Sequence, residues 1–203
     1  DISWEAEAIA NRFFAVRWRD GQLVVRDLIH GLAFDGLNTV ISEGDRGDEY
    51  NADILDDAVA TPRRARLLAV EADAVSAHLT YEIELTVPAA LVPDRTRRSA
   101  RRQVSLPIRT TVTLWSGLPR VDVSVALENR ARDHRLRALV PLPFRVDTAV
   151  TENQFHVAER PVHPPAWNGR SAEQPPATFP QKTFAAFESG GLGVAVFNRG
   201  LPE

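Results

Sequence analysis

The sequence contains no cysteine, no methionine and only one lysine, Lys182, among its 24 basic residues. Without cysteine there is no disulfide bond and no thiolate nucleophile, which is typical of a reducing compartment. Together with the arginine-rich composition of a GC-rich genome, this leads us to expect a cytoplasmic bacterial protein. No stretch approaches the ~20 apolar residues that a membrane-spanning helix needs. The net charge of −3 gives no general attraction to nucleic acid or membranes, so we expect neither as a partner.

The length and composition are those of a globular protein. At 203 residues the chain is long enough to bury one large core, and 44% hydrophobic and 25% charged residues are ordinary values. The absence of methionine indicates that residue 1 is not the start of translation. We therefore expect residues 1–203 to form a single domain that is a piece of a longer protein.

Most of the chain has the pattern of β-strands. Apolar and polar residues alternate over 64–88 and 103–129, and Asp20-Gly21 is a strong hairpin signal within 12–28. Only 3–13, SWEAEAIANRF, has a composition that could begin as a helix. Many strands without alternating helices predict an all-β fold, specifically a large antiparallel β-sandwich.

Two segments lack strand character. The segment 92–103 has five arginines within 95–102, but no aromatic platforms, so a mobile hairpin loop is favoured over a nucleic-acid patch. The segment 159–181 has six prolines and cannot be a central strand. Its Trp167 and Arg170 could contact a partner, since a long irregular segment in a compact domain is often functional.

The acidic stretch SEGDRGDEYN, at 42–51, has several possible functions. As a calcium loop that starts at Asp45 it fails, because Gly47 would stand at the third position, where a ligand is needed, and Tyr50 would replace the glycine required at the sixth. Arg46-Gly47-Asp48 spells an adhesion tripeptide, which occurs often by chance. A solvated turn and the rim of a sugar site remain open.

A second polar stretch, ENRARDHRLR, begins at Glu128 and precedes a strand. Its simplest interpretation is a turn between strands in which Asp133 pairs with Arg135 or Arg137. The five histidines lie apart from one another, so the sequence predicts no metal site in this chain. A G-x-S-x-G nucleophile motif is also absent.

In their order along the chain, these motifs closely resemble the C-terminal β-region of the α-mannosidases of glycoside hydrolase family 38. The resemblance rests on the D-G hairpin, the D-R-G-D-E-Y segment, the N-x-x-x-D-H-R-L-R corner and the final N-R-G-L-P-E, and it covers essentially all 203 residues. It implies a sandwich similar to the galactose mutarotase superfold. The residues that carry the structural motifs are Asp45, Asn129, Asp133, His134 and Arg137.

The resemblance also implies hydrolysis of α-mannosides with retention, by a carboxylate nucleophile and a carboxylic acid. In that family these groups and a zinc ion belong to a catalytic domain that precedes the β-region, and the H-x-D ligand motif is absent here. We therefore expect the isolated chain to be inactive and to hold no cofactor. Its expected partners are the catalytic domain of the same chain and an α-mannoside or glycan substrate.

For the acidic stretch, the resemblance implies that Tyr50 reaches the active site and hydrogen-bonds the bound sugar. Asp45 and Asp48 would shape the loop through bonds to backbone N–H groups and would compensate Arg46. On the same resemblance, Arg160 also lines the sugar site, which makes Tyr50, Asp48 and Arg160 the expected substrate-binding residues.

Three alternatives remain. A carbohydrate-binding module would use Trp167 or Trp18 as a stacking platform. A mutarotase-like epimerase would need a histidine acid and a glutamate base, for which His134 or His156 with Glu152 are candidates. The third alternative is a purely structural brace for the catalytic domain, with no role for Tyr50.

Overall fold

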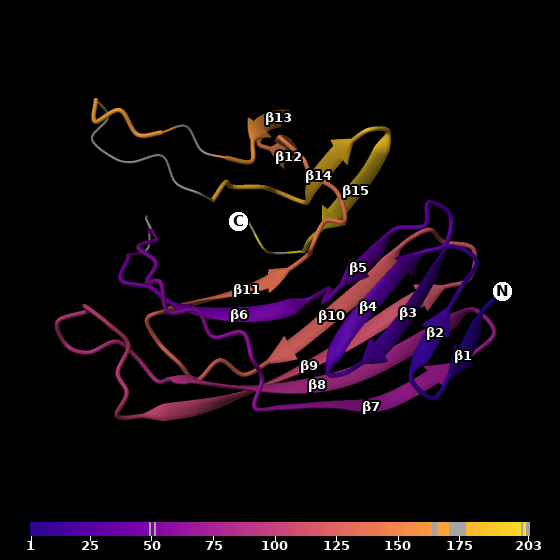
Figure 1. The fold of residues 1–203 in the computed structure, drawn as a ribbon, viewed down its shortest axis with the longest axis horizontal. Helices are drawn as coiled ribbons and strands as arrows, with labels where there is room; N and C mark the ends of the chain where they lie inside the picture. Colours follow the sequence, from indigo (N-terminus) through magenta and orange to yellow (C-terminus); the bar gives the residue numbers. More distant parts are fainter. Residues whose placement is uncertain (49, 51, 164–165, 171–177, 200, 202–203) are drawn as a thin grey trace. The chain divides into compact units, whose positions relative to one another are not determined.

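A computed structural model describes residues 1–203 except 49, 51, 164–165, 171–177, 200 and 202–203. The described residues contain fifteen β-strands and no helix, which confirms the all-β prediction. The chain divides into two compact units, Asp1–Pro141 and Leu142–Glu203 (Figure 1). The expectation of a single domain over 1–203 stays a prediction.

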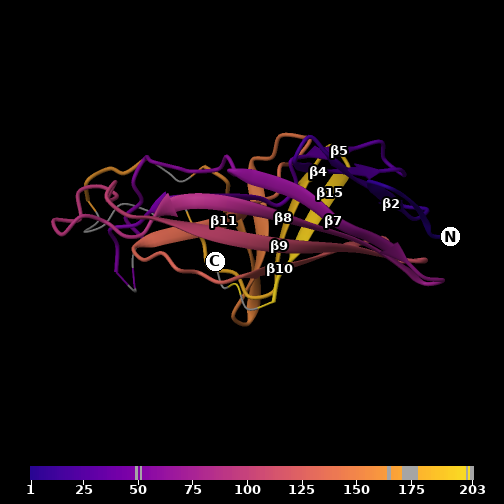
Figure 2. The ribbon, with the colours of Figure 1, turned by 90° about the horizontal axis from the view of Figure 1, so that it is seen from below.

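The first unit contains three antiparallel sheets, ordered β1-β2-β3-β4-β5, β10-β9-β8-β7 and β11-β6. Figure 2 shows the long strands β7, β8 and β9 running side by side. The strands of this unit are β1 (Ser3–Glu5), β2 (Ala8–Ala10), β3 (Phe14–Arg19), β4 (Gln22–Asp27), β5 (Ala33–Asp35), β6 (Thr39–Gly44), β7 (Arg64–Ala72), β8 (Ser76–Pro88), β9 (Gln103–Trp115), β10 (Val121–Leu127) and β11 (His134–Leu139).

The core of the first unit follows from the alternation in β8 and β9. Every second residue is buried: Leu79, Tyr81, Ile83, Leu85 and Val87 on β8, and Leu106, Ile108, Thr110, Val112 and Leu114 on β9. Burial of each large apolar side chain stabilises the fold by roughly 1.5–3 kcal/mol. Trp18 on β3 stacks on Tyr81 at a centroid distance of 4.4 Å, so the five-stranded sheet packs on the four-stranded one. This is the packing of a β-sandwich.

Trp18 is only 7% exposed because it belongs to this core. The alternative in which Trp18 stacks on a sugar ring is therefore wrong. A tryptophan in a strand serves equally well as a core residue or as a platform, and the strand pattern alone does not distinguish the two.

The hairpins form where the turn residues predict them. Asp20 and Gly21 both have positive φ, 51° and 78°, which is the backbone of a type I′ turn between β3 and β4. Gly190 and Gly191 do the same in the second unit, with φ values of 62° and 80°.

The helix considered for residues 3–13 does not form. Instead β1 and β2 pair as a hairpin, and β2 also pairs with β3. Ile9 is 1% exposed in the core, so its burial against the sheet outweighs the modest helix preference of the neighbouring alanines and glutamates.

The second unit is one antiparallel sheet ordered β13-β12-β14-β15. Its strands are β12 (Thr148–Asn153), β13 (His156–Pro161), β14 (Phe184–Ser189) and β15 (Leu192–Phe197). Phe184 and Phe197 pack across β14 and β15 with a ring-centroid distance of 6.0 Å.

Candidate functional site

The acidic stretch and the D-H-R-L-R corner are neighbours in the structure. β6 ends at Gly44 and pairs with β11, so that Gly44 lies opposite His134. One residue further on, the Asp45 N–H donates to the carbonyl of Asp133 at 2.9 Å. The loop that follows, residues 45–53, is called the Tyr50 loop below. Its starting point is fixed by this pairing.

The neck of the Tyr50 loop is closed by its own residues. The Asp45 carboxylate accepts hydrogen bonds from the N–H groups of Gly47, at 2.8 Å, and Asp53, at 2.9 Å. The Arg46 N–H donates to the Asp53 carbonyl at 2.8 Å, and the Arg46 guanidinium also pairs with the Asp53 carboxylate at 2.8 Å. Asp53, which the sequence analysis did not name, is thus the acid that compensates Arg46.

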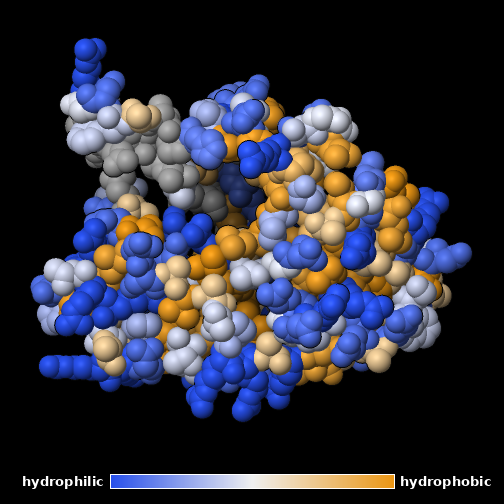
Figure 3. Space-filling view, in the orientation of Figure 1, coloured by the Kyte–Doolittle hydropathy of each residue, from blue (hydrophilic) through white to orange (hydrophobic). Residues whose placement is uncertain are grey.

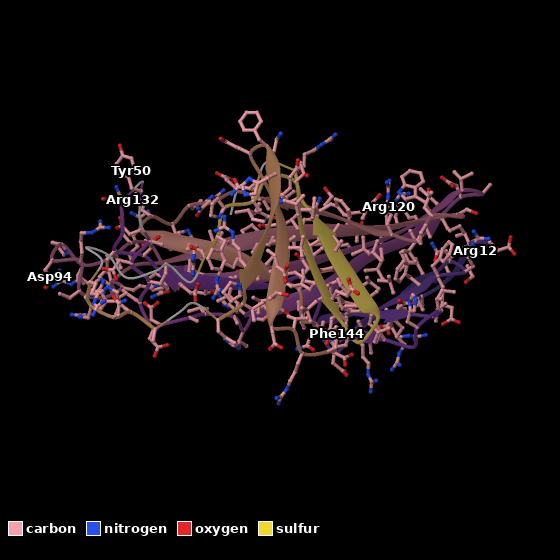
Figure 4. The ribbon with its side chains drawn as sticks, turned by 90° about the horizontal axis from the view of Figure 1, so that it is seen from above. Arg12, Tyr50, Asp94, Arg120, Arg132 and Phe144 are labelled. Carbon is pink, nitrogen blue, oxygen red and sulfur yellow. The ribbon has the colours of Figure 1, made fainter. Side chains whose placement is uncertain are left out.

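Tyr50 lies at the tip of this loop. Its N–H donates to the Asp48 carboxylate at 2.8 Å, which shapes the backbone just before the ring. The side chain projects away from the ribbon (Figure 4), and the residue is 83% exposed. A large aromatic residue is thus held outside the core on a loop with a closed neck.

The corner at Asp133 differs from the expectation. Its carboxylate pairs with Arg95 at 3.2 Å and accepts a hydrogen bond from the Leu91 N–H at 3.2 Å, so the predicted pairing with Arg135 or Arg137 is wrong. The reason is geometric. Asp133 precedes β11 and has a positive φ of 51°, which turns it away from the strand.

The strand arginines pair instead with Glu43 on β6. Arg137 donates to both carboxylate oxygens at 2.6 and 2.7 Å, and Arg135 lies at 3.4 Å. Arg135 is directly opposite Glu43 in the register, and Arg137 is on the same strand face. The hydrogen bonds from Arg137 outweigh burial and lower the pKa of Glu43 below its ordinary value.

A buried arginine lies under the start of the loop. The Arg98 side chain is 7% exposed, its Nε is 3.1 Å from the Asp57 carboxylate without the alignment of a hydrogen bond, and it donates to the Ser42 hydroxyl at 3.1 Å. Burial lowers the pKa of the Arg98 guanidinium, although Asp57 and Glu43 act in the opposite direction. Asp57 also accepts a hydrogen bond from the Gly44 N–H at 2.8 Å.

His134 belongs to the same network. Its Nε2 lies 2.9 Å from Asn129 Oδ1, which also accepts the Ala131 N–H, and its Nδ1 lies 3.0 Å from the Ser42 hydroxyl. A neutral ring satisfies both contacts, by donating to Asn129 and accepting from Ser42. Burial, and then the charge of Arg98, lower the pKa of His134. Such a histidine is a structural one.

Arg160 lies in the second unit, on β13. Its guanidinium carbon is 5.0 Å from the centroid of the Phe179 ring, and its Nε is buried without a hydrogen-bond partner. In the same unit Trp167 is 51% exposed. An exposed aromatic side chain therefore exists outside the Tyr50 loop, as the carbohydrate-binding alternative requires.

The structure does not favour an epimerase pair in the second unit. Glu152 is opposite Val157 in the β12–β13 register, so His156, one residue earlier, is on the other face of the ribbon. The Glu152 carboxylate also accepts a hydrogen bond from the Thr183 hydroxyl.

Across the residues that the structure describes, no group of three histidine, cysteine, aspartate or glutamate side chains could hold a metal ion. The same residues include no helix that is long and apolar enough to cross a membrane.

The network also contains residues that the sequence analysis did not single out. The acids Glu43 and Asp57 and the arginines Arg95 and Arg98 hold the loop and the corner together. The five arginines of 95–102 were the available signal, because such a loop needs carboxylates nearby. At this end of the first unit the surface is mostly hydrophilic (Figure 3).

Comparison with known proteins gives a consistent result. A family model described as the C-terminal domain of glycosyl hydrolases family 38 matches residues 40–201. A protein of Halalkalibacterium halodurans named "Putative mannosylglycerate hydrolase" is 26% identical over 202 residues, which cover 91% of this chain and 22% of that protein.

Two solved structures from Enterococcus faecalis have the same fold. One is a protein in glycosyl hydrolase family 38, with a TM-score of 0.80 and 20% identity over 98% of this chain and 25% of the other. The second, an α-mannosidase, has a TM-score of 0.79 and 21% identity over 98% of this chain and 24% of the other. The chain thus spans at most a quarter of the length of these relatives. Since the family model matches well over half of it, this chain belongs to the family of C-terminal domains of glycosyl hydrolases family 38.

Proposed function

We propose that this chain is the β-region of a retaining α-mannosidase, in which the Tyr50 loop completes the rim of the sugar site. The observation that carries the proposal is the combination of a closed loop neck, from Asp45 to Asp53, with a phenol that is 83% exposed. The ring takes no part in the core of the first unit, so it is accessible to a ligand.

The chemistry of a phenol suits a sugar rim. Its rigid apolar ring packs against the C–H groups of a pyranose, and its hydroxyl both donates and accepts hydrogen bonds. The nucleophile, the acid and the zinc ion belong to the catalytic domain of the intact protein. The contribution of this chain is to bind and orient the substrate and to brace that domain.

The name of the bacterial relative supports the substrate class, because mannosylglycerate is a mannoside. We therefore assign an α-mannoside as substrate. Within the second unit, Arg160 is the further substrate-binding candidate, because its guanidinium has a buried Nε without a hydrogen-bond partner.

The test uses the intact parent enzyme and two alanine variants. Tyr50→Ala is expected to lower kcat/KM for an aryl α-mannoside, because it removes both the ring and the hydroxyl. Trp4→Ala is the matched control, since Trp4 is an aromatic residue of the same unit, 57% exposed, on β1. Equal kinetic parameters in both variants and the wild type would contradict the proposal.

A carbohydrate-binding module is the second candidate, and the exposed Trp167 is the observation that favours it. On this alternative, Trp167→Ala weakens retention of the intact protein on a mannan affinity gel, while Tyr50→Ala does not. The rim function thus predicts a loss of activity in Tyr50→Ala, whereas the binding-module function predicts a loss of retention in Trp167→Ala.

A further inference from the structure

The connection between β8 and β9 contacts the Tyr50 loop through the Arg95 side chain. This connection is a hairpin loop, as predicted, while its mobility stays a prediction. Leu91 and Arg98 are paired as an isolated bridge, and the Arg95 N–H donates to the Val92 carbonyl. Arg95 lies at its turn with a positive φ of 58°. For a long side chain this backbone is unfavourable, and it persists only where surrounding contacts hold it.

The Arg95 guanidinium contacts both ends of the site network. One nitrogen, Nη1, donates to the Asp133 carboxylate at 3.2 Å, and the other, Nη2, donates to the Gly47 carbonyl at 3.1 Å and reaches the Asp45 carbonyl at 3.5 Å. Gly47 is three residues before Tyr50. The planar fork of arginine allows one side chain to bind a carboxylate and a carbonyl at once, which lysine does not reproduce.

Asp133 is itself fixed from two directions. Its second carboxylate oxygen accepts the Leu91 N–H, and its carbonyl accepts the Asp45 N–H. Arg95, Asp133 and the start of the Tyr50 loop therefore form a closed ring of contacts among three segments that are distant in sequence. Removal of the guanidinium breaks the contacts to the Asp133 carboxylate and to the Gly47 carbonyl, and Gly47 is on the part of the loop that leads to Tyr50.

We propose that Arg95 is a positioning residue. It holds the backbone of the Tyr50 loop at Gly47, so that Tyr50 presents its hydroxyl to the sugar. This inference rests on the proposed role of Tyr50. It also assigns a function to the arginine-rich segment, which is to fix the acidic loop rather than to bind nucleic acid. Arg95 itself does not touch the substrate.

The experiment is a double-mutant cycle in the intact parent enzyme, with an aryl α-mannoside as substrate. The variants are Arg95→Ala, Tyr50→Ala and the double substitution. Arg97→Ala is the matched control, because Arg97 is an exposed arginine of the same loop that has no ion pair within the described part of the chain. Arg95→Lys keeps the charge but not the fork, and thermal midpoints are recorded for all variants.

If Arg95 acts through Tyr50, Arg95→Ala lowers kcat/KM roughly three- to tenfold in the wild type, the size of one lost hydrogen bond. The same change has less than about a twofold effect once Tyr50 is alanine, because residues that act as a unit are not additive. Arg95→Lys is intermediate, and Arg97→Ala matches the wild type.

Each contrary outcome has a distinct meaning. If the Arg95→Ala loss is undiminished without Tyr50, or if the variant is kinetically silent while Tyr50→Ala is impaired, Arg95 does not position Tyr50 and only this inference fails. If Tyr50→Ala is itself silent, the proposed function fails, and the positioning role fails with it. Should Arg95→Ala not fold, the cycle with Arg95→Lys decides by the same criterion.

Discussion

Arg95 and Asp133 form an ion pair of 3.2 Å, and both have positive φ, 58° and 51° respectively. Aspartate tolerates this backbone more readily than arginine does. Two unusual backbone positions, 38 residues apart, thus meet through their side chains at the base of an exposed loop. An arginine seldom adopts a positive φ by itself, so the contacts of the ion pair must stabilise this backbone conformation at Arg95.

The buried charge of Arg98 makes Asp57 important for stability. Asp57→Asn keeps an oxygen for the Gly44 N–H but removes the charge that faces the guanidinium. We expect a loss of about 2 kcal/mol in the free energy of unfolding, less than the ~3–5 kcal/mol of a fully buried pair because Asp57 is partly exposed.

Urea denaturation measures this loss. Glu5→Gln is the control, since the Glu5–Arg17 pair is largely exposed and its removal should leave the midpoint unchanged. An Asp57→Asn midpoint equal to that of Glu5→Gln would show that Arg98 does not depend on Asp57.

Position 44 needs a glycine because there is no room for a side chain, and not because of its backbone φ angle. A Cβ atom there would lie 2.9 Å from Leu55 Cδ1 and 3.1 Å from the Arg98 side chain. Gly44→Ala should therefore destabilise the protein by about 1–3 kcal/mol through overpacking. Gly193→Ala is the matched control, because its Cβ would lie 3.8 Å from the Phe187 carbonyl oxygen, an ordinary contact, and it should be neutral or slightly stabilising. Differential scanning calorimetry on both variants checks this, and equal midpoints would disprove it.

His134 gives stability a pH dependence of known sign. Its pKa is lowered in the folded protein, so the unfolded chain binds a proton first as the pH falls. The contribution of the neutral ring is fully present above its ordinary pKa of 6.5 and is lost as the pH falls through 6.5 toward the lower folded value. Asp133 opposes the shift, while Arg98 adds to it.

The thermal midpoint should therefore decrease between about pH 7.5 and pH 5.5, and His134→Gln should flatten that decrease. Glu43 does not interfere, because its lowered pKa places its effect below pH 4.5. If the thermal midpoint of His134→Gln decreases with pH as much as that of the wild type, the decrease is caused by groups other than His134.

The isolated chain is expected to be catalytically inactive. The acid–nucleophile pair of a retaining glycosidase has to flank the sugar, and on the proposed function both groups belong to a catalytic domain outside residues 1–203. Purified residues 1–203, with the circular dichroism of a β protein, should release no product from an aryl α-mannoside. Turnover that disappears when one of its own carboxylates is replaced would refute this prediction.

Features of the fold that depend on neighbours in sequence could be predicted from the sequence, whereas those that depend on contacts between distant segments could not. Alternation in β8 and β9 and the Asp20-Gly21 turn are local signals, and they predicted the sheets correctly. Residues 3–13 were ambiguous because their fate depended on the burial of Ile9 against distant strands. The pairing of Asp133 was predicted wrongly because neighbours in sequence were chosen, whereas the actual partner, Arg95, comes from another hairpin.

For the site, sequence reasoning reached the acidic loop and its tyrosine but not the residues that hold them. No local pattern distinguishes Glu43 and Asp57 from the other acids of the chain. Their importance follows only from the arginines placed opposite them by the register of β6 and β11 and by the arginine-rich hairpin. Charge compensation across segments is a tertiary property, which one-dimensional spacing does not encode.

The most direct test of the central claim is the kinetics of Tyr50→Phe in the intact enzyme, with an α-mannoside as substrate. The change keeps the ring and removes only the hydroxyl, so the predicted loss is about 1 kcal/mol, or a three- to tenfold lower kcat/KM. If the bond tightens in the oxocarbenium-like transition state, the loss appears in kcat rather than in KM. The thermal midpoint should hardly change, because Tyr50 is exposed. Wild-type kcat and KM together with a lowered midpoint would contradict the account and make Tyr50 a structural residue.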